Sequence, residues 1–151
     1  MRLIAAALAC ALSISASAQT VVGSDPTNLA LRSGSWAYSQ TPAASEASFM
    51  DSSGIAQLTI RCVRANRSIV LSMRAVPATS LTVWTSSASR SLPATFDQPS
   101  SRLNASLNSN DPLLDALAFS RGRISFSVQG VSPLVLPAWP EPARAIEDCR
   151  N

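Results

Sequence analysis

Residues 55–74 read IAQLTIRCVRANRSIVLSMR, and this stretch decides the fold class. On each side of its RANR segment (64–67), apolar and polar residues alternate, as they do in a β-strand that has one face in the core. Two alternating runs joined by a short polar link predict an antiparallel β-hairpin. The apolar positions are Leu58, Ile60 and Cys62 before the link, and Ile69, Leu71 and Met73 after it.

The same pattern recurs along the chain at a spacing of roughly ten residues, which is typical of sandwiches and barrels. We expect an earlier strand at 34–39 and read TPAASEAS (41–48) as a loop or weak helix. Residues 32–151 are therefore predicted to form a mainly β fold, a single antiparallel β-sandwich or barrel-like domain with two short helices. Further strands are expected at 81–86, 91–96, 102–108 and 123–130.

The first helix is predicted from its start signal. Asp111 is suited to the N-cap and Pro112 to the first helical position. Gly122 fits the turn into the next strand. The apolar face of this helix would be Leu113, Leu114 and Leu117.

The second helix is expected at the C-terminus, where Glu141 and Pro142 begin it. Ile146 and Cys149 share one side of this helix with Ala143, so the helix should pack inward and bring the thiol to the sheet. After removal of a signal peptide only two cysteines remain, and an even pair in an oxidising compartment predicts a Cys62–Cys149 disulfide. Two free buried thiols are the alternative.

The N-terminus has the three parts of a secretory signal peptide: Arg2, the apolar run 3–14 and the small-residue site Ala16-Ser17-Ala18. We predict a signal peptide at 1–18, a mobile N-terminal arm at 19–31 and export to the periplasm or beyond. Cys10 suggests a lipoprotein signal as the alternative, but ALAC lacks the usual leucine. No stretch is long enough to predict a transmembrane helix.

The composition excludes several kinds of chemistry. The chain has no histidine, and all of its 12 basic residues are arginine. Catalytic triads with histidine, Schiff bases and lysine-dependent phosphate loops are therefore excluded, and we expect no cofactor and no metal site. The net charge of +3 is too small to predict nucleic-acid binding.

Carboxylate chemistry remains open. A glycosidase-like pair could be drawn from five residues, although capping or solvated roles explain each of them as well. The segment around Asp51, MDSSGI, has one serine too many for an aspartic-protease motif and reads as a Ser/Gly turn. The five candidates are Asp111, Asp115, Glu141, Glu147 and Asp148.

Four arginines form the candidate binding surface. Alternation places Arg61 and Arg74 on the polar face of the predicted hairpin, and the link adds Arg64 and Arg67. No acidic residue lies between Asp51 and Asp97, so no carboxylate nearby in sequence neutralises these arginines. Guanidinium groups can hold a carboxylate or phosphate bidentately, so an anionic partner would suit this face, whereas a merely solvated face is the alternative.

Three features of the region 55–150 occur in a recognisable order: Cys62 after a strand, Trp84 in LTVWTS, and LLDALAFSRGRISFSVQG (113–130) followed by a terminal helix with Cys149. In these features the region resembles uncharacterised exported proteins of alphaproteobacteria. This layout is similar to that of type VI secretion accessory proteins and invasion-associated locus B proteins. The resemblance implies an envelope-associated β domain without known catalysis.

These observations together predict a non-catalytic periplasmic β domain that binds another envelope component, either a protein or an anionic molecule. A carboxylate-based hydrolase and a structural envelope protein are the alternatives. Two carboxylates converging in a cleft would favour the hydrolase. An exposed arginine or aromatic patch would favour the binding domain.

Overall fold

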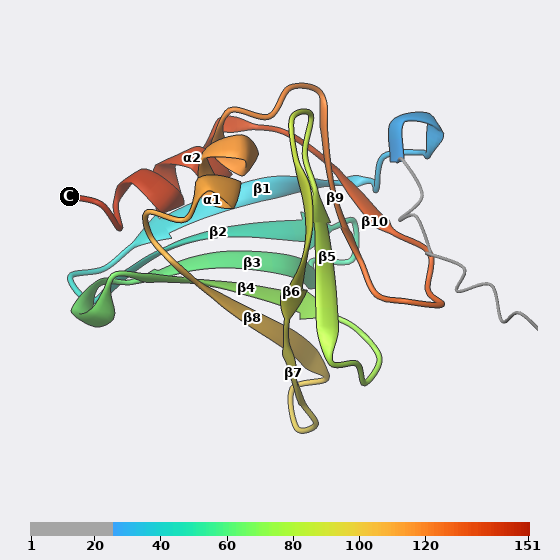
Figure 1. The fold of residues 1–151 in the computed structure, drawn as a ribbon, viewed down its shortest axis with the longest axis horizontal. Helices are drawn as coiled ribbons and strands as arrows, with labels where there is room; N and C mark the ends of the chain where they lie inside the picture. The colour runs from blue at the N-terminus through green and yellow to red at the C-terminus, as the bar shows by residue number, and fades with distance from the viewer. Residues whose placement is uncertain (1–25) are drawn as a thin grey trace, which may run out of the picture.

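The computed structural model describes residues 26–151, which form two antiparallel sheets and two α-helices (Figure 1). The six-stranded sheet has the order β1-β2-β3-β4-β8-β7, and the four-stranded sheet has the order β10-β9-β5-β6. The fold class predicted from the sequence is confirmed. The strands are β1 (Gly34–Gln40), β2 (Ala44–Asp51), β3 (Ala56–Val63), β4 (Ser68–Arg74), β5 (Ser80–Trp84), β6 (Ser89–Pro93), β7 (Thr95–Asp97), β8 (Arg102–Asn108), β9 (Arg123–Ser127) and β10 (Leu134–Pro137).

The predicted hairpin is the pair β3–β4 at the centre of the six-stranded sheet. Its register places Leu58 opposite Met73, and the other apolar positions pair in the same way. Because side chains alternate between the faces of a strand, all six apolar residues point inward and are buried. The link forms a short 3-10 helix, η2 (Arg64–Asn66), after which Arg67 adopts a left-handed conformation with φ of 49°.

Three parts of the strand prediction need correction. Residues 41–48 do not form a loop or weak helix: most of them belong to β2, which pairs with β1 and β3 on both sides. The predicted strand 91–96 is interrupted at Ala94 and contributes to two sheets as β6 and β7. Strand β10 was not predicted at all. In β2 the inward-facing residues include small ones, so the apolar alternation that marks a strand is weak.

Helix α1 (Pro112–Ala118) begins as predicted. Asp111 is its N-cap, and the Asp111 carboxylate accepts a hydrogen bond of 2.9 Å from the N–H of Leu113. The predicted apolar face of α1 is buried, and Gly122 adopts the positive φ that the following turn requires.

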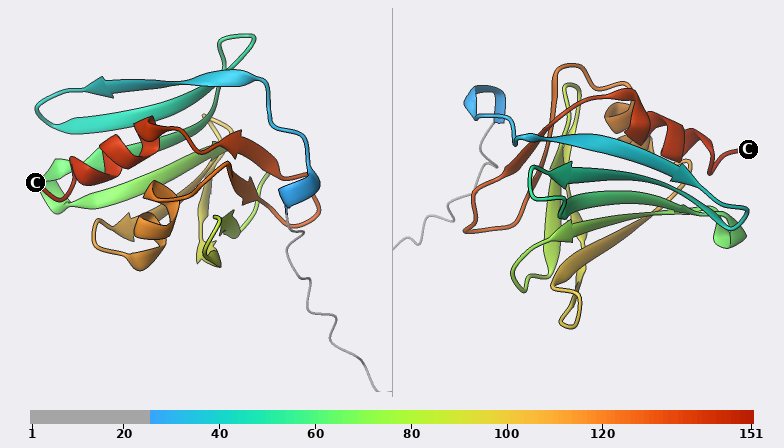
Figure 2. Two further views of the ribbon diagram at one scale, coloured as in Figure 1. Left: turned by 90° about the horizontal axis from the view of Figure 1, so that it is seen from above. Right: turned by 180° about the vertical axis from the view of Figure 1, so that it is seen from behind.

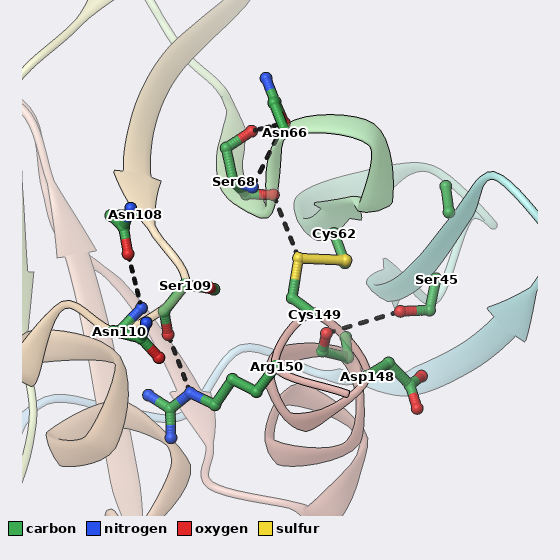
Figure 3. Close-up of a disulfide and its surroundings, with 12 residues drawn as sticks. Ser45, Cys62, Asn66, Ser68, Asn108, Ser109, Asn110, Asp148, Cys149 and Arg150 are labelled. Carbon is green, nitrogen blue, oxygen red and sulfur yellow. Dashed lines mark hydrogen bonds between the residues drawn. A yellow bond between two sulfur atoms is a disulfide. The ribbon is translucent and has the colours of Figure 1, made fainter.

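Helix α2 (Pro140–Glu147) leads to the disulfide Cys62–Cys149, which is confirmed (Figure 3). The two Cα atoms lie 5.4 Å apart, and both cysteines are buried. Ile146, on the inward side of α2, is completely buried. Arg150 adds a further tie, because its Nε donates a hydrogen bond of 2.8 Å to the carbonyl of Ser109.

The two helices and the four-stranded sheet divide the inner face of the six-stranded sheet between them. Helix α2 packs on β1, β2 and β3 at the end where Cys62 lies, and α1 packs beside α2. The strands of the four-stranded sheet cross those of the six-stranded sheet at a steep angle (Figures 1 and 2). The helices therefore cover one end of the space between the sheets, and loops surround the other end.

Both sides of this space are held together. On one side the chain runs directly from β6 into β7, and thus from one sheet into the other. On the other side the backbone N–H of Arg32 donates to the carbonyl of Val135 (2.8 Å), and the indole N–H of Trp36 donates to that of Pro137 (2.9 Å). The end away from the helices, which the loops after β4 and β9 surround, is referred to below as the open end.

The predicted signal peptide (1–18) and the first part of the predicted arm (19–25) lie outside the described residues. The rest of the arm contains a short 3-10 helix, η1 (Pro26–Asn28), that packs against β9. The Arg123 guanidinium donates a hydrogen bond to the carbonyl of Leu29 in this segment. Across residues 26–151, neither helix combines the length and the hydropathy that a membrane span requires.

Candidate functional site at the open end

The structure distributes the four predicted arginines along the whole β3–β4 hairpin. Arg61 and Arg74 lie on the outer face of the six-stranded sheet, as the alternation predicted. Arg61 is opposite Val70, four residues before Arg74, which corresponds to a separation of about 13 Å along the strand. Because of this separation, Arg61 and Arg74 do not share a binding site for one small anion.

Arg61 also has an acidic neighbour that the local sequence did not reveal. Its guanidinium lies 3.6 Å from the carboxylate of Glu46, which the β2–β3 register places directly opposite Arg61. The expectation of an arginine face without a neutralising carboxylate therefore needs correction. Glu46 escaped notice because it precedes Asp51 and because the segment that contains it was not recognised as a strand.

Arg64 and Arg67 lie at the far end of the hairpin from Arg74, in and after η2. Arg64 is half-buried and close enough to Tyr38 for its charge to act on the phenol. Arg67 is exposed at the turn. Of the four predicted residues, only Arg74 lies at the open end.

Arg102 is an outer-face arginine that the sequence analysis did not single out. Its guanidinium donates to the side chain and the carbonyl of Ser72 (2.8 and 2.6 Å). It also donates to the carbonyl of Ala56 (3.1 Å) and the hydroxyl of Thr59 (3.3 Å). Burial lowers the pKa of Arg102. With four of its donors engaged, Arg102 links three strands and has little capacity left for a ligand.

The open end contains a cleft between the two sheets with a volume of about 230 Å³. Its deeper walls are core side chains from both sheets, and its mouth is formed by the loops that follow β4 and β9. Arg32 and Arg74 belong to the lining, and both are exposed. Arg74 is the last residue of β4, so it lies at the edge of the cleft although alternation directs its side chain to the outer face of the sheet. The remaining lining residues are Gln57, Met73, Ala75, Val76, Phe126, Val128, Val131, Ser132, Pro133 and Leu134.

The guanidinium groups of the two cleft arginines are not paired directly within the described residues. Neither has an ion pair or a hydrogen bond to residues 26–151. Arg32 does act electrostatically on Asp51, whose pKa is held below its ordinary value chiefly by the N–H of Ile55 and, more weakly, by Arg32. The Asp51 carboxylate also accepts hydrogen bonds from the N–H of Ser53 and from Gln57, so it stabilises its own turn.

This turn is the one that MDSSGI predicted. Asp51 lies at the end of β2, and Gly54 has a φ of 74°. The hydrogen bonds to the Asp51 carboxylate are those of an Asx turn. The segment is therefore a structural turn, as expected.

The carboxylates proposed for the hydrolase alternative do not converge: three of them are engaged in separate local interactions, and Glu147 is exposed at the end of α2. Both oxygens of Asp111 accept hydrogen bonds from Arg90, at 2.8 and 2.7 Å, in addition to the helix cap. Asp115 pairs with Arg150 at 2.7 Å. Glu141 lies in the first turn of α2, where the helix dipole favours a negative charge.

The sequence suggested that Asp148 is merely solvated, but in the structure it has a hydrogen-bond partner. It accepts a hydrogen bond from the hydroxyl of Tyr38, and this hydrogen bond is the main reason why the pKa of Tyr38 is raised. The Arg144 guanidinium lies 4.4 Å from the centre of the Tyr38 ring, so the phenol, the carboxylate and the cation form one small cluster on α2 and β1. Four surface cavities formed by residues 26–151 each contain at most one carboxylate.

Sequence reasoning missed Arg32 and the cleft itself. Arg32 lies in a segment without periodicity, and only the contact between that segment and β10 brings it to the open end. Among the described residues, no group of three or more His, Cys, Asp or Glu side chains is arranged to hold a metal ion. Comparison of the chain with family models, with curated proteins and with solved structures gave no match.

Proposed function

We propose that this chain is a non-catalytic, exported β domain that binds an anionic component of the cell envelope through Arg74 and Arg32. The observation that carries the proposal is that both arginines line one cleft while neither guanidinium makes a hydrogen bond or ion pair within residues 26–151. Asp51, on which Arg32 acts electrostatically, is engaged in its own turn. An unpaired guanidinium at a cleft is a ready donor for a carboxylate or phosphate.

Export is supported by two independent features. The sequence of residues 1–18 has the pattern of a signal peptide, and the described chain carries a buried disulfide. A disulfide of this kind is expected in the periplasm or outside the cell and is rare in the cytoplasm of most organisms.

A binding role is favoured over catalysis by the residue inventory. The chain lacks histidine and lysine altogether, and three of the five carboxylate candidates are engaged by Arg90, Arg150 or Tyr38. The cleft itself contains two arginines and no carboxylate. Such a lining suits recognition of an anion better than acid–base chemistry.

The test is co-sedimentation of the processed protein with phospholipid vesicles. We expect binding to vesicles that contain phosphatidylglycerol, weaker binding to phosphatidylcholine vesicles, and a decrease with salt because exposed charges are screened. The double variant Arg32→Gln/Arg74→Gln should bind the anionic vesicles about 30-fold more weakly, since each arginine near an anionic surface contributes about 1 kcal/mol.

The matched control is Arg67→Gln/Arg121→Gln, which removes two exposed arginines that lie outside the cleft. This variant changes the net charge equally but should retain most of the binding. Equal loss in the two double variants would show that the total charge, rather than the cleft, is responsible, and the proposal would then be wrong. Absence of binding to anionic vesicles would also contradict it.

A further inference from the structure

We infer that the ligand of this cleft is an amphiphile: its anionic head lies at Arg32 and Arg74, and its apolar end enters between the two sheets. This inference rests on the proposed function, because it uses the same two arginines. It adds the chemical class of the ligand, which the charges alone do not define.

The walls of the cleft carry the inference. Phe126, Met73 and Val128 belong to the hydrophobic core of the domain, and they also line the cleft. Apart from the two arginines, only Gln57 and Ser132 contribute polar side chains. These three side chains are already almost completely out of water, so they make the floor of the cleft apolar without exposing it. The apolar surface that a ligand's chain would remove from water, at a gain in free energy, is that of Val76 and Val131 at the mouth.

The mouth of the cleft adds an independent observation. Val76 and Val131, on the loops after β4 and β9, are 50% and 47% exposed. Both line the cleft beside the arginines. The lining therefore combines buried core residues, half-exposed valines and exposed arginines, which are the components that a chain with an anionic head requires.

The size of the cleft limits the ligand. A volume of about 230 Å³ lies below the roughly 300–1,000 Å³ of sites that enclose drug-sized ligands. Only a short apolar chain, or the end of a longer one, can enter. The head must remain at the mouth, where Arg32 and Arg74 are.

The experiment compares three probes added to the processed protein: decanoate below its micelle concentration, decanol and acetate. Binding is measured by calorimetry and by amide chemical shifts. We expect decanoate to bind at least about tenfold more tightly than acetate, because of chain burial. The amide shifts should concentrate at Ala75, Val128 and Val131. Arg74→Gln should weaken decanoate binding and leave decanol binding unchanged.

A matched pair of variants tests the apolar part. Val131→Ser removes an apolar side chain that lines the cleft and should weaken decanoate binding about threefold or more. Ile55→Ser removes a similarly exposed side chain on the β2–β3 turn that does not line the cleft, and it should have no effect. Equal effects of the two variants would overturn the inference.

The outcomes separate the inference from the proposed function. If acetate and decanoate bind equally and both depend on Arg74, the anion site stands and the apolar part is wrong. If decanoate and decanol bind equally and Arg74→Gln has no effect, the proposed function is wrong as well. Phosphatidylglycerol vesicles are a further probe in this experiment. If the vesicles shift the same amide signals as decanoate does, the natural ligand is a membrane lipid. If only decanoate shifts them, the natural ligand is a free amphiphile.

Discussion

Reduction of the Cys62–Cys149 disulfide should lower the free energy of unfolding by about 3–4 kcal/mol without unfolding the protein. The two cysteines are 87 residues apart, and a loop of this length corresponds to roughly 4–5 kcal/mol of chain entropy in the unfolded state. Measured values for disulfides are usually somewhat smaller. Since domains of this size are stable by about 5–15 kcal/mol, a substantial part of the stability depends on this one bond.

The reduced protein should nevertheless keep α2 in place. Ile146 and Ala145 are completely buried against the core, and Ser45 donates a hydrogen bond to the carbonyl of Ala145. Arg150 also retains its ion pair with Asp115. These contacts do not depend on the sulfur–sulfur bond, so the loss of stability should come mainly from the unfolded chain.

The assay is urea unfolding followed by tryptophan fluorescence, with and without a phosphine reductant. Both the midpoint and the slope are informative, because an unfolded chain without the cross-link is more expanded and exposes more surface, which raises the slope. The variant Cys62→Ala/Cys149→Ala serves as the control and should not respond to the reductant. A loss below about 1 kcal/mol with an unchanged slope would contradict this prediction, since the bond would then not restrict the unfolded chain.

Two further predictions concern single carboxylates. Asp111→Ala should cost about 1–2 kcal/mol in urea unfolding because it removes the cap of α1, whereas Asp111→Asn keeps a capping oxygen and should cost less. Partial burial raises the pKa of Asp111, but the hydrogen bonds from Arg90 and Leu113 outweigh this effect, so the pKa in the folded protein lies below the ordinary value. The carboxylate therefore stabilises the fold at neutral pH, and this stabilisation is lost as the pH falls through the folded pKa. Similar costs for Asp111→Ala and Asp111→Asn would argue against the cap. Tyr38 is the single tyrosine of the chain, so ultraviolet titration reads its ionisation directly, and its pKa should lie above the ordinary value because Asp148 accepts its hydroxyl hydrogen. Asp148→Asn should bring it back toward that value, and an unchanged titration would exclude this hydrogen bond in solution.

The parts of the fold that depend on neighbouring residues could be predicted from the amino-acid sequence. Alternation over residues 55–74 specified the central hairpin and its buried face, because side-chain direction in a strand follows from position alone. Asp111 specified the start of α1 for a similarly local reason, since a cap binds an N–H two residues away. The cysteine count, combined with the predicted signal peptide, specified the single disulfide.

Which charged side chains pair with each other, and which do not, depends on how distant segments pack together. Glu46 neutralises Arg61 because β2 pairs with β3, and β2 has too few large apolar residues for its strand to be recognised from sequence. Arg32 and Arg74 are 42 positions apart in the chain, and they line one cleft because the segment that contains Arg32 packs beside β10. Strand pairing and sheet packing bring distant residues together through cooperative burial of the whole core. A short stretch of sequence therefore does not predict which distant residues become neighbours.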